Sequence, residues 1–374
     1  YHSGNDATEK GSIVSEMVSG DTTKAIGVSM NQAPGSISSP AVASLLGSAE
    51  NSMNSNVWQP WNAEMRAEKF KQQLERFMAN IAVDRFRTAS LPKALHTDSF
   101  LHENGIVVHI ADNNEITYEH VFQPANRHSR LTSLKGLLSA LSARATLPRV
   151  SFLVVLNDGS RPSYAAFGAL RGSVQWQNMI PFPMGNTRGW STGFGLNFTG
   201  WDAYVESWYL SRHSDYPWSR KIPKAVFRGN FAMTGQEVGS CWISCNIIRD
   251  WRRVARGLMY LRTKDYPELF DVKFTSKGTK KGISIDEISA DASFKLDFAD
   301  FMRYKAILNV GTNNDWAERL RNLLFTNSVI LFHEVKCEEW FYAFLEPMVH
   351  YVPIRTDMSD IVDKQRWVLE HDAE

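Results

Sequence analysis

Charged residues that follow short apolar segments are the groups in this sequence best suited to chemistry. Arg228-Gly229-Asn230 directly follows the mostly apolar stretch 224–227. A glycine lets the backbone approach a diphosphate closely, and an arginine can donate two parallel hydrogen bonds to its oxygens. Taken alone, however, the tripeptide is better explained by a surface salt bridge at the end of a strand.

A second candidate cation follows a turn. Arg319 comes after the turn-forming residues 311–314, in an expected helix at 315–324. A position just after a turn and early in a helix suits a phosphate ligand. The alternative is an ordinary amphipathic helix with its arginine in water. Arg321, two residues later, falls on the far side of such a helix and is expected to be solvated.

Three carboxylates are also candidates. Asp158 follows the apolar strand expected at 150–156, where a carboxylate is costly unless it faces a cleft. Its alternative is a turn-forming Asp-Gly pair. Glu338 and Glu339 precede Trp340 and can reach sugar hydroxyls, or they are first-turn acids favoured by the helix dipole.

The stretch 160–200 is rich in glycine, proline and aromatic residues, with little periodicity. Arg188 and Trp190 lie in it and suit an acceptor groove, although packing over the sheet explains most such aromatics equally well.

The expected elements alternate between strand and helix, which is typical of a parallel sheet covered by helices. Ligands of such sheets bind where the strands end, and that is where the candidate residues lie. A hairpin is expected at 105–120. Strands are expected at 150–156, 224–227, 271–274, 304–310, 328–332 and 349–354, and helices at 63–83, 131–142, 201–212, 247–261, 315–324, 338–345 and 359–371.

The order of motifs from 304 to 354 resembles glycosyltransferase family 90, which contains the Rumi-like protein O-glucosyltransferases and the capsule-associated xylosyltransferases. The motifs are Y-K-x-I-L-N-x-G, R-L-x-x-L-L, S-V-I-L, E-W-F-Y and L-x-P-x-V-H-Y-V-P-I, and W-S-R-K-x-P-K-A-V-F-R-G-N lies upstream. The resemblance covers about the last two thirds of the chain, from Val150. The sequence departs from it at Met348, where the family has Trp, and in a longer loop before Arg319.

This resemblance implies an α/β protein of the GT-B type, with two Rossmann-like domains facing across a cleft. It implies an inverting, metal-independent transfer of glucose or xylose from UDP-glucose or UDP-xylose to a protein serine or a glycan hydroxyl, in the lumen of the endoplasmic reticulum or Golgi. Asp158 is then the catalytic base. The implied donor-binding residues are Arg228, Gly229, Asn230, Arg249, Asn314, Trp316, Arg319 and Glu339. A catalytically inactive sugar- or nucleotide-binding protein on the same fold is the alternative, which the atypical segment 231–244 and Met348 favour.

The composition of the chain limits the kinds of partner and cofactor that we expect it to bind. Formal net charge is +1, from 41 basic and 40 acidic residues, which gives no indication of a nucleic-acid partner. No apolar run approaches the ~20 residues of a membrane span. The sequence lacks Asp-x-Asp and the common phosphate-binding glycine motifs, so we expect no metal or other cofactor. Cys241, Cys245 and Cys337 allow at most one internal disulfide and fit no zinc site well.

Three segments are expected. Residues 1–56 are rich in serine, glycine, asparagine and alanine and are expected to be a disordered stem or linker. An acceptor-side domain with Asp158 is expected at 57–220, and a nucleotide-sugar-binding domain at 221–374, with its terminal helices cut short.

Overall fold

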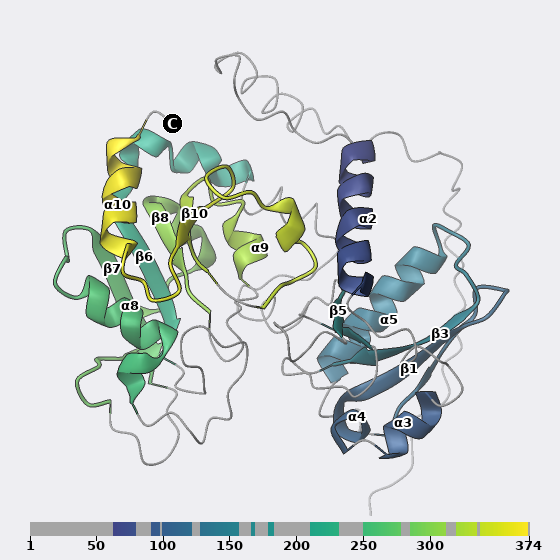
Figure 1. Ribbon diagram of the computed structural model, residues 1–374. Helices are drawn as coiled ribbons and strands as arrows, with labels where there is room; N and C mark the ends of the chain where they lie inside the picture. Colours follow the sequence, from purple (N-terminus) through teal and green to yellow (C-terminus); the bar gives the residue numbers. More distant parts are fainter. Residues whose placement is uncertain are drawn as a thin grey trace, which may run out of the picture. The chain divides into compact units, whose positions relative to one another are not determined.

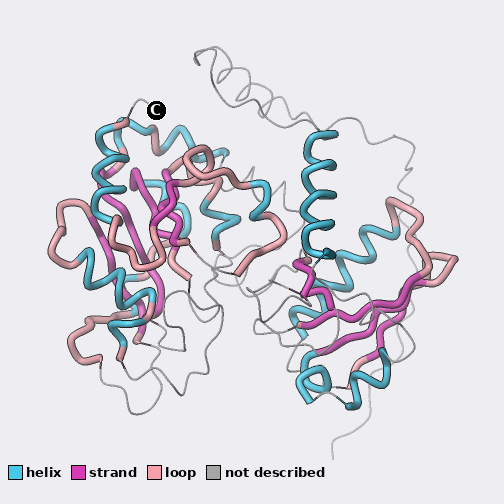
Figure 2. Tube along the Cα trace, viewed as in Figure 1, coloured by secondary structure: helices cyan, strands magenta, loops and turns pink. Residues whose placement is uncertain are grey.

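Two five-stranded sheets make up the core of the protein (Figures 1 and 2). The computed structural model describes residues 63–79, 91–97, 99–121, 128–156, 166–168, 179–182, 210–231, 250–277, 285–311, 319–334 and 337–372. The stem expected at 1–56 lies outside these residues.

The first sheet has the strand order β2-β1-β3-β4-β5. Its strands are β1 Gly105–Ile110, β2 Ile116–Glu119, β3 Val150–Val155, β4 Ala166–Gly168 and β5 Met179–Pro181. The expected hairpin is confirmed as the antiparallel pair β1–β2. The strand expected at 150–156 is confirmed as β3, which pairs antiparallel with β1 and parallel with β4.

Alternation along the strands gives this sheet two apolar faces. Ile106, Val108 and Ile110 pack with α5 (His128–Ser142), whereas Val107 joins the cluster of α3 (Leu91–Thr97) and α4 (Ser99–Asn104). The sheet is therefore covered on both sides. Helix α2 (Ala63–Ala79) precedes these elements.

The second sheet is wholly parallel, with the order β10-β9-β8-β6-β7. Its strands are β6 Ile222–Asn230, β7 Phe270–Ser276, β8 Tyr304–Asn309, β9 Val329–His333 and β10 Val352–Ile354. One face packs on α8 (Ala255–Thr263) and α10 (Ile361–Glu370). The other packs on α9 (Leu320–Leu323) and short 3-10 turns, η9 (Phe298–Arg303) and η10 (Tyr342–Phe344). All five strands point the same way, so their carboxyl ends share one edge of the sheet (Figure 1).

Four expectations about this half were wrong in detail. The described part of the helix expected at 247–261 is divided into the 3-10 turn η7 (Trp251–Arg253) and helix α8. The tripeptide 228–230 belongs to strand β6 instead of following it. The helix expected at 338–345 is only the turn η10, because its adjacent aromatic rings pack in different directions and aromatic residues favour helix weakly. The strand expected from 349 begins at Val352, after a turn in which the His350 backbone N–H donates to the Glu346 carbonyl.

Two 3-10 turns precede β6: η5 (Leu210–Asp215) and η6 (Trp218–Arg220). A third, η7 (Trp251–Arg253), lies between β6 and α8 along the chain. A further one, η8 (Ala292–Phe294), follows β7. The chain thus has a mixed α/β fold with two sheets rich in parallel pairings. Within the described residues no helix combines the length and apolarity needed to cross a membrane.

Candidate functional site

Two buried arginines lie at the carboxyl ends of strands β6 and β8. Arg256 is in the first turn of α8, and Arg319 immediately precedes α9. Each is only 6% exposed. Their guanidinium carbons lie 5.1 Å and 4.8 Å, respectively, from the ring centre of Phe227, so both cations pack on the same aromatic ring.

Backbone carbonyls at the strand ends hold both guanidinium groups. Arg256 donates from Nη1 to the Asn230 side-chain oxygen at 2.8 Å and from Nη2 to the Val310 carbonyl at 3.2 Å. Arg319 donates from Nη1 to the Arg228 carbonyl at 2.7 Å and from Nη2 to the same Val310 carbonyl at 3.5 Å. The two cations therefore converge on the ends of two neighbouring strands.

No carboxylate among the described residues forms an ion pair with either of these arginines. Burial lowers the pKa of Arg319 to about 10, so it is protonated at neutral pH. Burial, and then the charge of Arg319, lower the pKa of Arg256. Two like charges held together in a buried position are costly, and an anion between them would offset that cost.

Unused donors distinguish this pair from another buried cation. Lys221 also has only neutral partners, but its three N–H bonds match three acceptors: the Met302 carbonyl, the Thr326 carbonyl and the Ser328 hydroxyl. A guanidinium has five N–H donors, and the buried Nε atoms of Arg256 and Arg319 have no partner. All three donors of the lysine are therefore satisfied, whereas each arginine of the pair has a buried donor that is not.

Gly229 leaves space beside both cations. A β-carbon built there would lie 3.5 Å from Nη1 of Arg319 and 3.6 Å from Nη1 of Arg256. It would also approach the Phe227 ring to 3.3 Å. Glycine is therefore the residue that lets a ligand come near the two guanidinium groups at this point.

Arg228 has a different environment. Its Nη2 lies 2.7 Å from the Asp271 carboxylate, and its Nη1 donates to the Asp271 carbonyl at 2.6 Å. Tyr304 donates to the same carboxylate at 2.6 Å. Although burial opposes ionisation of Asp271, hydrogen bonds from Arg228 and Tyr304 lower its pKa overall. The salt bridge considered for Arg228 is thus present, although it is buried, and diphosphate binding by this side chain stays a prediction.

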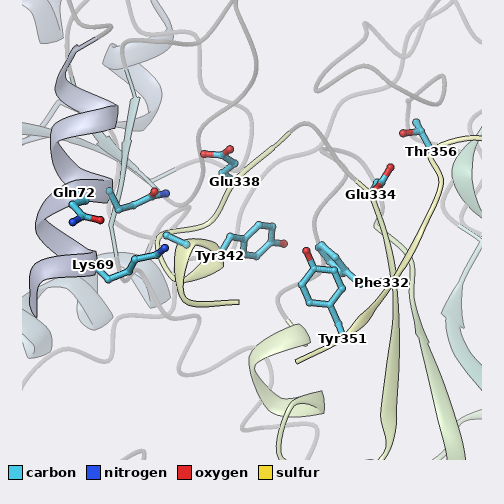
Figure 3. Close-up of a pocket in the computed structure, with 10 residues that line it drawn as sticks. Lys69, Gln72, Phe332, Glu334, Glu338, Tyr342, Tyr351 and Thr356 are labelled. Carbon is cyan, nitrogen blue, oxygen red and sulfur yellow. The ribbon is translucent and has the colours of Figure 1, made fainter. Parts of the chain in front are cut away.

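A pocket of about 670 Å³ opens at the carboxyl ends of the next two strands, β9 and β10. Phe332, Tyr342 and Tyr351 form its aromatic part, with ring centres 5.5 Å and 5.0 Å from that of Phe332. In Figure 3 the two tyrosine hydroxyls turn toward each other, with Glu338 and Glu334 on opposite sides. Lys69, Gln72, Gln73, Ala343 and Thr356 complete the lining.

A disulfide anchors the chain next to Glu338. Cys337 is 1% exposed and disulfide-bonded. The chain has only two other cysteines, Cys241 and Cys245, and both lie outside the described residues. Glu339, the predicted sugar-binding residue, is 3% exposed and is not among the residues that line the pocket; the Tyr342 hydroxyl donates to it at 3.4 Å.

The structure brings together some of the predicted residues and leaves others undescribed. Arg228, Gly229, Asn230 and Arg319 lie at one sheet edge, and Glu339 lies near the neighbouring pocket. The predictions for Asp158, Arg188, Trp190, Arg249, Asn314 and Trp316 lie outside the described residues. No group of three or more potential metal-ligating side chains occurs among the residues that are described.

Sequence reasoning missed Arg256. It lies in the middle of the helix expected at 247–261, where no local signal marks it. The structure begins α8 at Ala255 and so places Arg256 in a first turn, where a cation opposes the helix dipole and needs another reason to be there.

Comparison with known proteins agrees with these features. The profile of Glycosyl transferase family 90 matches residues 173–374. Protein O-glucosyltransferase 2 of Danio rerio is 44% identical to this chain over 21% of the chain and 16% of the relative. Protein O-glucosyltransferase 1 of Rattus norvegicus is 26% identical over 48% of the chain and 39% of the relative. Protein O-glucosyltransferase 3 of Rattus norvegicus is 32% identical over 42% of the chain and 26% of the relative. The matched part thus spans less than half the length of each of these relatives. Since the family profile covers more than half of the chain, this protein belongs to glycosyltransferase family 90.

Proposed function

We propose that this protein transfers glucose or xylose from a UDP-sugar to a protein serine or a glycan hydroxyl, with inversion and without a metal ion. The observation that carries the proposal is the pair of buried guanidinium groups, Arg256 and Arg319, that have no carboxylate partner among the described residues. In a glycosyltransferase, the nucleotide diphosphate is the anion that such a pair would bind.

The geometry suggests how these cations would assist the reaction. The acceptor oxygen attacks the anomeric carbon of the sugar, and the bond from that carbon to the diphosphate oxygen breaks. UDP leaves with the electron pair, so negative charge grows on the diphosphate. Arg256 and Arg319 would stabilise that charge in place as it develops, without reorganising.

A base must take the proton of the acceptor hydroxyl. Asp158 is our candidate, because it comes three residues after the end of β3 along the chain, and the carboxyl half of that strand is buried. In the proposed GT-B arrangement the first sheet would present this aspartate across a cleft from the donor on the second sheet. The names of the relatives suggest a protein hydroxyl as one acceptor. The disulfide at Cys337 supports an oxidising compartment such as the lumen of the secretory pathway.

Sugar transfer and UDP binding, measured side by side, test this proposal. Asp158→Asn keeps the size and turn propensity of the side chain but cannot accept the proton. We expect turnover to fall by ~10²–10⁴-fold while calorimetric affinity for UDP stays near that of the wild type. A normal rate would place the base elsewhere, and a failure of the wild type to bind UDP would overturn the donor assignment.

A further inference from the structure

A second pocket, here called the amino-edge pocket, lies at the opposite edge of the second sheet. Its volume is about 440 Å³. Asn327 and Ser328 of its lining come just before β9, and His350 and Tyr351 come just before β10. The five residues of β9 each extend the strand by ~3.3 Å, so this edge is roughly 15 Å from the edge that carries the arginine pair. A molecule bound in the amino-edge pocket is therefore separate from the proposed donor.

Two half-buried tryptophans line this pocket, and the protein fixes the orientation of both rings. Trp218 donates from Nε1 to the Asp372 carboxylate at 2.9 Å, and Nζ of Lys305 lies 5.2 Å from the centre of the Trp218 ring. Trp367 stacks on His371, with ring centres 4.5 Å apart and an interplanar angle of 21°. Rings fixed in this way offer apolar surfaces that lose little further freedom when a ligand binds.

The polar groups of the lining suit an uncharged ligand. Asp372 is the only carboxylate among the described lining residues, and a hydrogen bond from Lys305 compensates its charge and lowers its pKa. The exposed amide of Asn327 makes no hydrogen bond to the described residues. His371 donates from Nδ1 to the Trp367 carbonyl, which leaves Nε2 of the neutral ring as an acceptor. Sugar hydroxyls can both donate to and accept from these groups, whereas an apolar ligand would only displace their water.

The backbone of the lining gives an independent indication of a ligand. Asn327 has a φ of 50° and Met348 a φ of 65°, both in the left-handed region. Asparagine adopts this region readily, whereas a methionine there is unusual and carries a steric cost. The Met348 side chain is 49% exposed, so burial within the protein does not offset that cost. Residues held in such conformations are concentrated at functional sites, and a ligand that covers the methionine would account for it.

We propose that the amino-edge pocket binds a neutral pyranose unit of a glycan, with the sugar ring against the tryptophans and its hydroxyls at Asn327, His371 and Asp372. The inference goes beyond the proposed transfer reaction, because the pocket lies at the edge of the sheet that the donor does not occupy. A sugar bound here is not the one that reacts. It anchors a glycan to the enzyme at a distance from the reaction.

The methyl glycosides of glucose, galactose and mannose test this proposal, with cyclohexylmethanol as the matched probe that keeps the six-membered ring but lacks the ring hydroxyls. Saturation-transfer NMR of the wild type should detect at least one glycoside, and saturating UDP should not displace it. Cyclohexylmethanol should bind at least about tenfold more weakly, because it cannot pair with the polar groups. Absence of binding by all three glycosides, displacement by UDP, or stronger binding of cyclohexylmethanol would overturn the proposal.

Variants then locate the sugar. Asn327→Gly and Met348→Gly remove one side chain each at positions whose backbone glycine adopts without strain, so both should fold and bind UDP normally but bind the glycoside severalfold more weakly. Trp367→Leu keeps an apolar side chain but removes the ring, and binding should fall about tenfold. Met65→Ala, which removes an equally exposed methionine from α2, is the control and should bind the glycoside normally. Normal glycoside binding by both glycine variants would place the sugar elsewhere, whatever the fate of Trp367→Leu.

Discussion

Arg228 and the pair Arg256–Arg319 lie at the same sheet edge and are buried to a similar extent, but their surroundings differ. Arg228 has a carboxylate partner in Asp271, which in turn accepts from Tyr304. Arg256 and Arg319 have only carbonyl and amide oxygens. The difference separates a cation whose charge is compensated within the protein from two cations whose charge calls for an external anion.

Arg228→Ala should therefore cause the largest loss of stability. Removing one partner leaves the half-buried Asp271 carboxylate with only the Tyr304 hydroxyl and the Lys273 ammonium at 3.9 Å. Breaking a buried pair in this way costs about 3–5 kcal/mol. Denaturant unfolding measures this loss. Arg252→Ala is the control, because its ion pairs with Asp250 and Glu287 are exposed and contribute ~0–1 kcal/mol. Similar losses in the two variants would mean that the Arg228 pair is not structural.

Truncating the other two arginines should instead affect ligand binding. Arg256→Ala and Arg319→Ala should each weaken UDP binding roughly ten- to hundredfold, through loss of a charge-assisted contact of ~1.5–3 kcal/mol. Their melting temperatures should change less than that of Arg228→Ala, because no buried carboxylate loses its partner. Arg252→Ala removes the same charge from an exposed position and should bind UDP normally. Unchanged affinity in both truncated variants would contradict the site.

Gly229→Ala should have a smaller effect on the same ligand. The added methyl group would approach both Nη1 atoms to about the distance of van der Waals contact and occupy the space beside them. We expect UDP affinity to fall severalfold, with stability reduced by less than about 1 kcal/mol, since only the Phe227 ring has to yield. If calorimetry shows wild-type affinity, the anion does not approach over Gly229.

Chelation of divalent metal ions should have the smallest effect, because we expect it to leave turnover unchanged. If the two guanidinium groups compensate the leaving diphosphate, turnover should be the same before and after treatment with EDTA. The measurement is UDP release with and without chelator. A rate abolished by EDTA and restored by manganese would show that the cations at this edge are insufficient.

How far the sequence determines this site depends on the kind of residue. The strands of the second sheet were predictable, because continuous runs such as 304–309 are buried on both faces and leave a clear apolar signal. Arg319 and Gly229 were found from turn and strand-end chemistry. Arg228 and Arg256 could not be told apart in this way, because the difference between them is the position of Asp271, 43 residues from Arg228 along the chain. The pairing of β6 with β7 brings Asp271 beside Arg228 and so decides which arginine has a carboxylate partner.

The aromatic segment 338–345 shows a second limit. Its spacing predicts a helix, but Trp340 packs edge-on against Phe341 and Phe344, and Tyr342 packs on Phe332 of β9. These contacts outweigh the weak helical preference. The contact of Tyr342 with Phe332 of β9 cannot be predicted from a local sequence pattern. For the same reason Glu338, instead of the predicted Glu339, is the residue that lines the pocket.

The order of the second sheet also has a consequence for how the protein is made. One of its inner strands, β6, has no neighbour close in sequence: Ala225 pairs with Phe270 on one side, and Ile222 pairs with Tyr304 on the other. Closing such distant contacts is slow, and at roughly 5–20 residues per second a ribosome needs several seconds to supply β8 after β6. During that interval one edge of β6 has no partner strand. The nascent chain therefore depends on being shielded from other unpaired edges until β8 is complete.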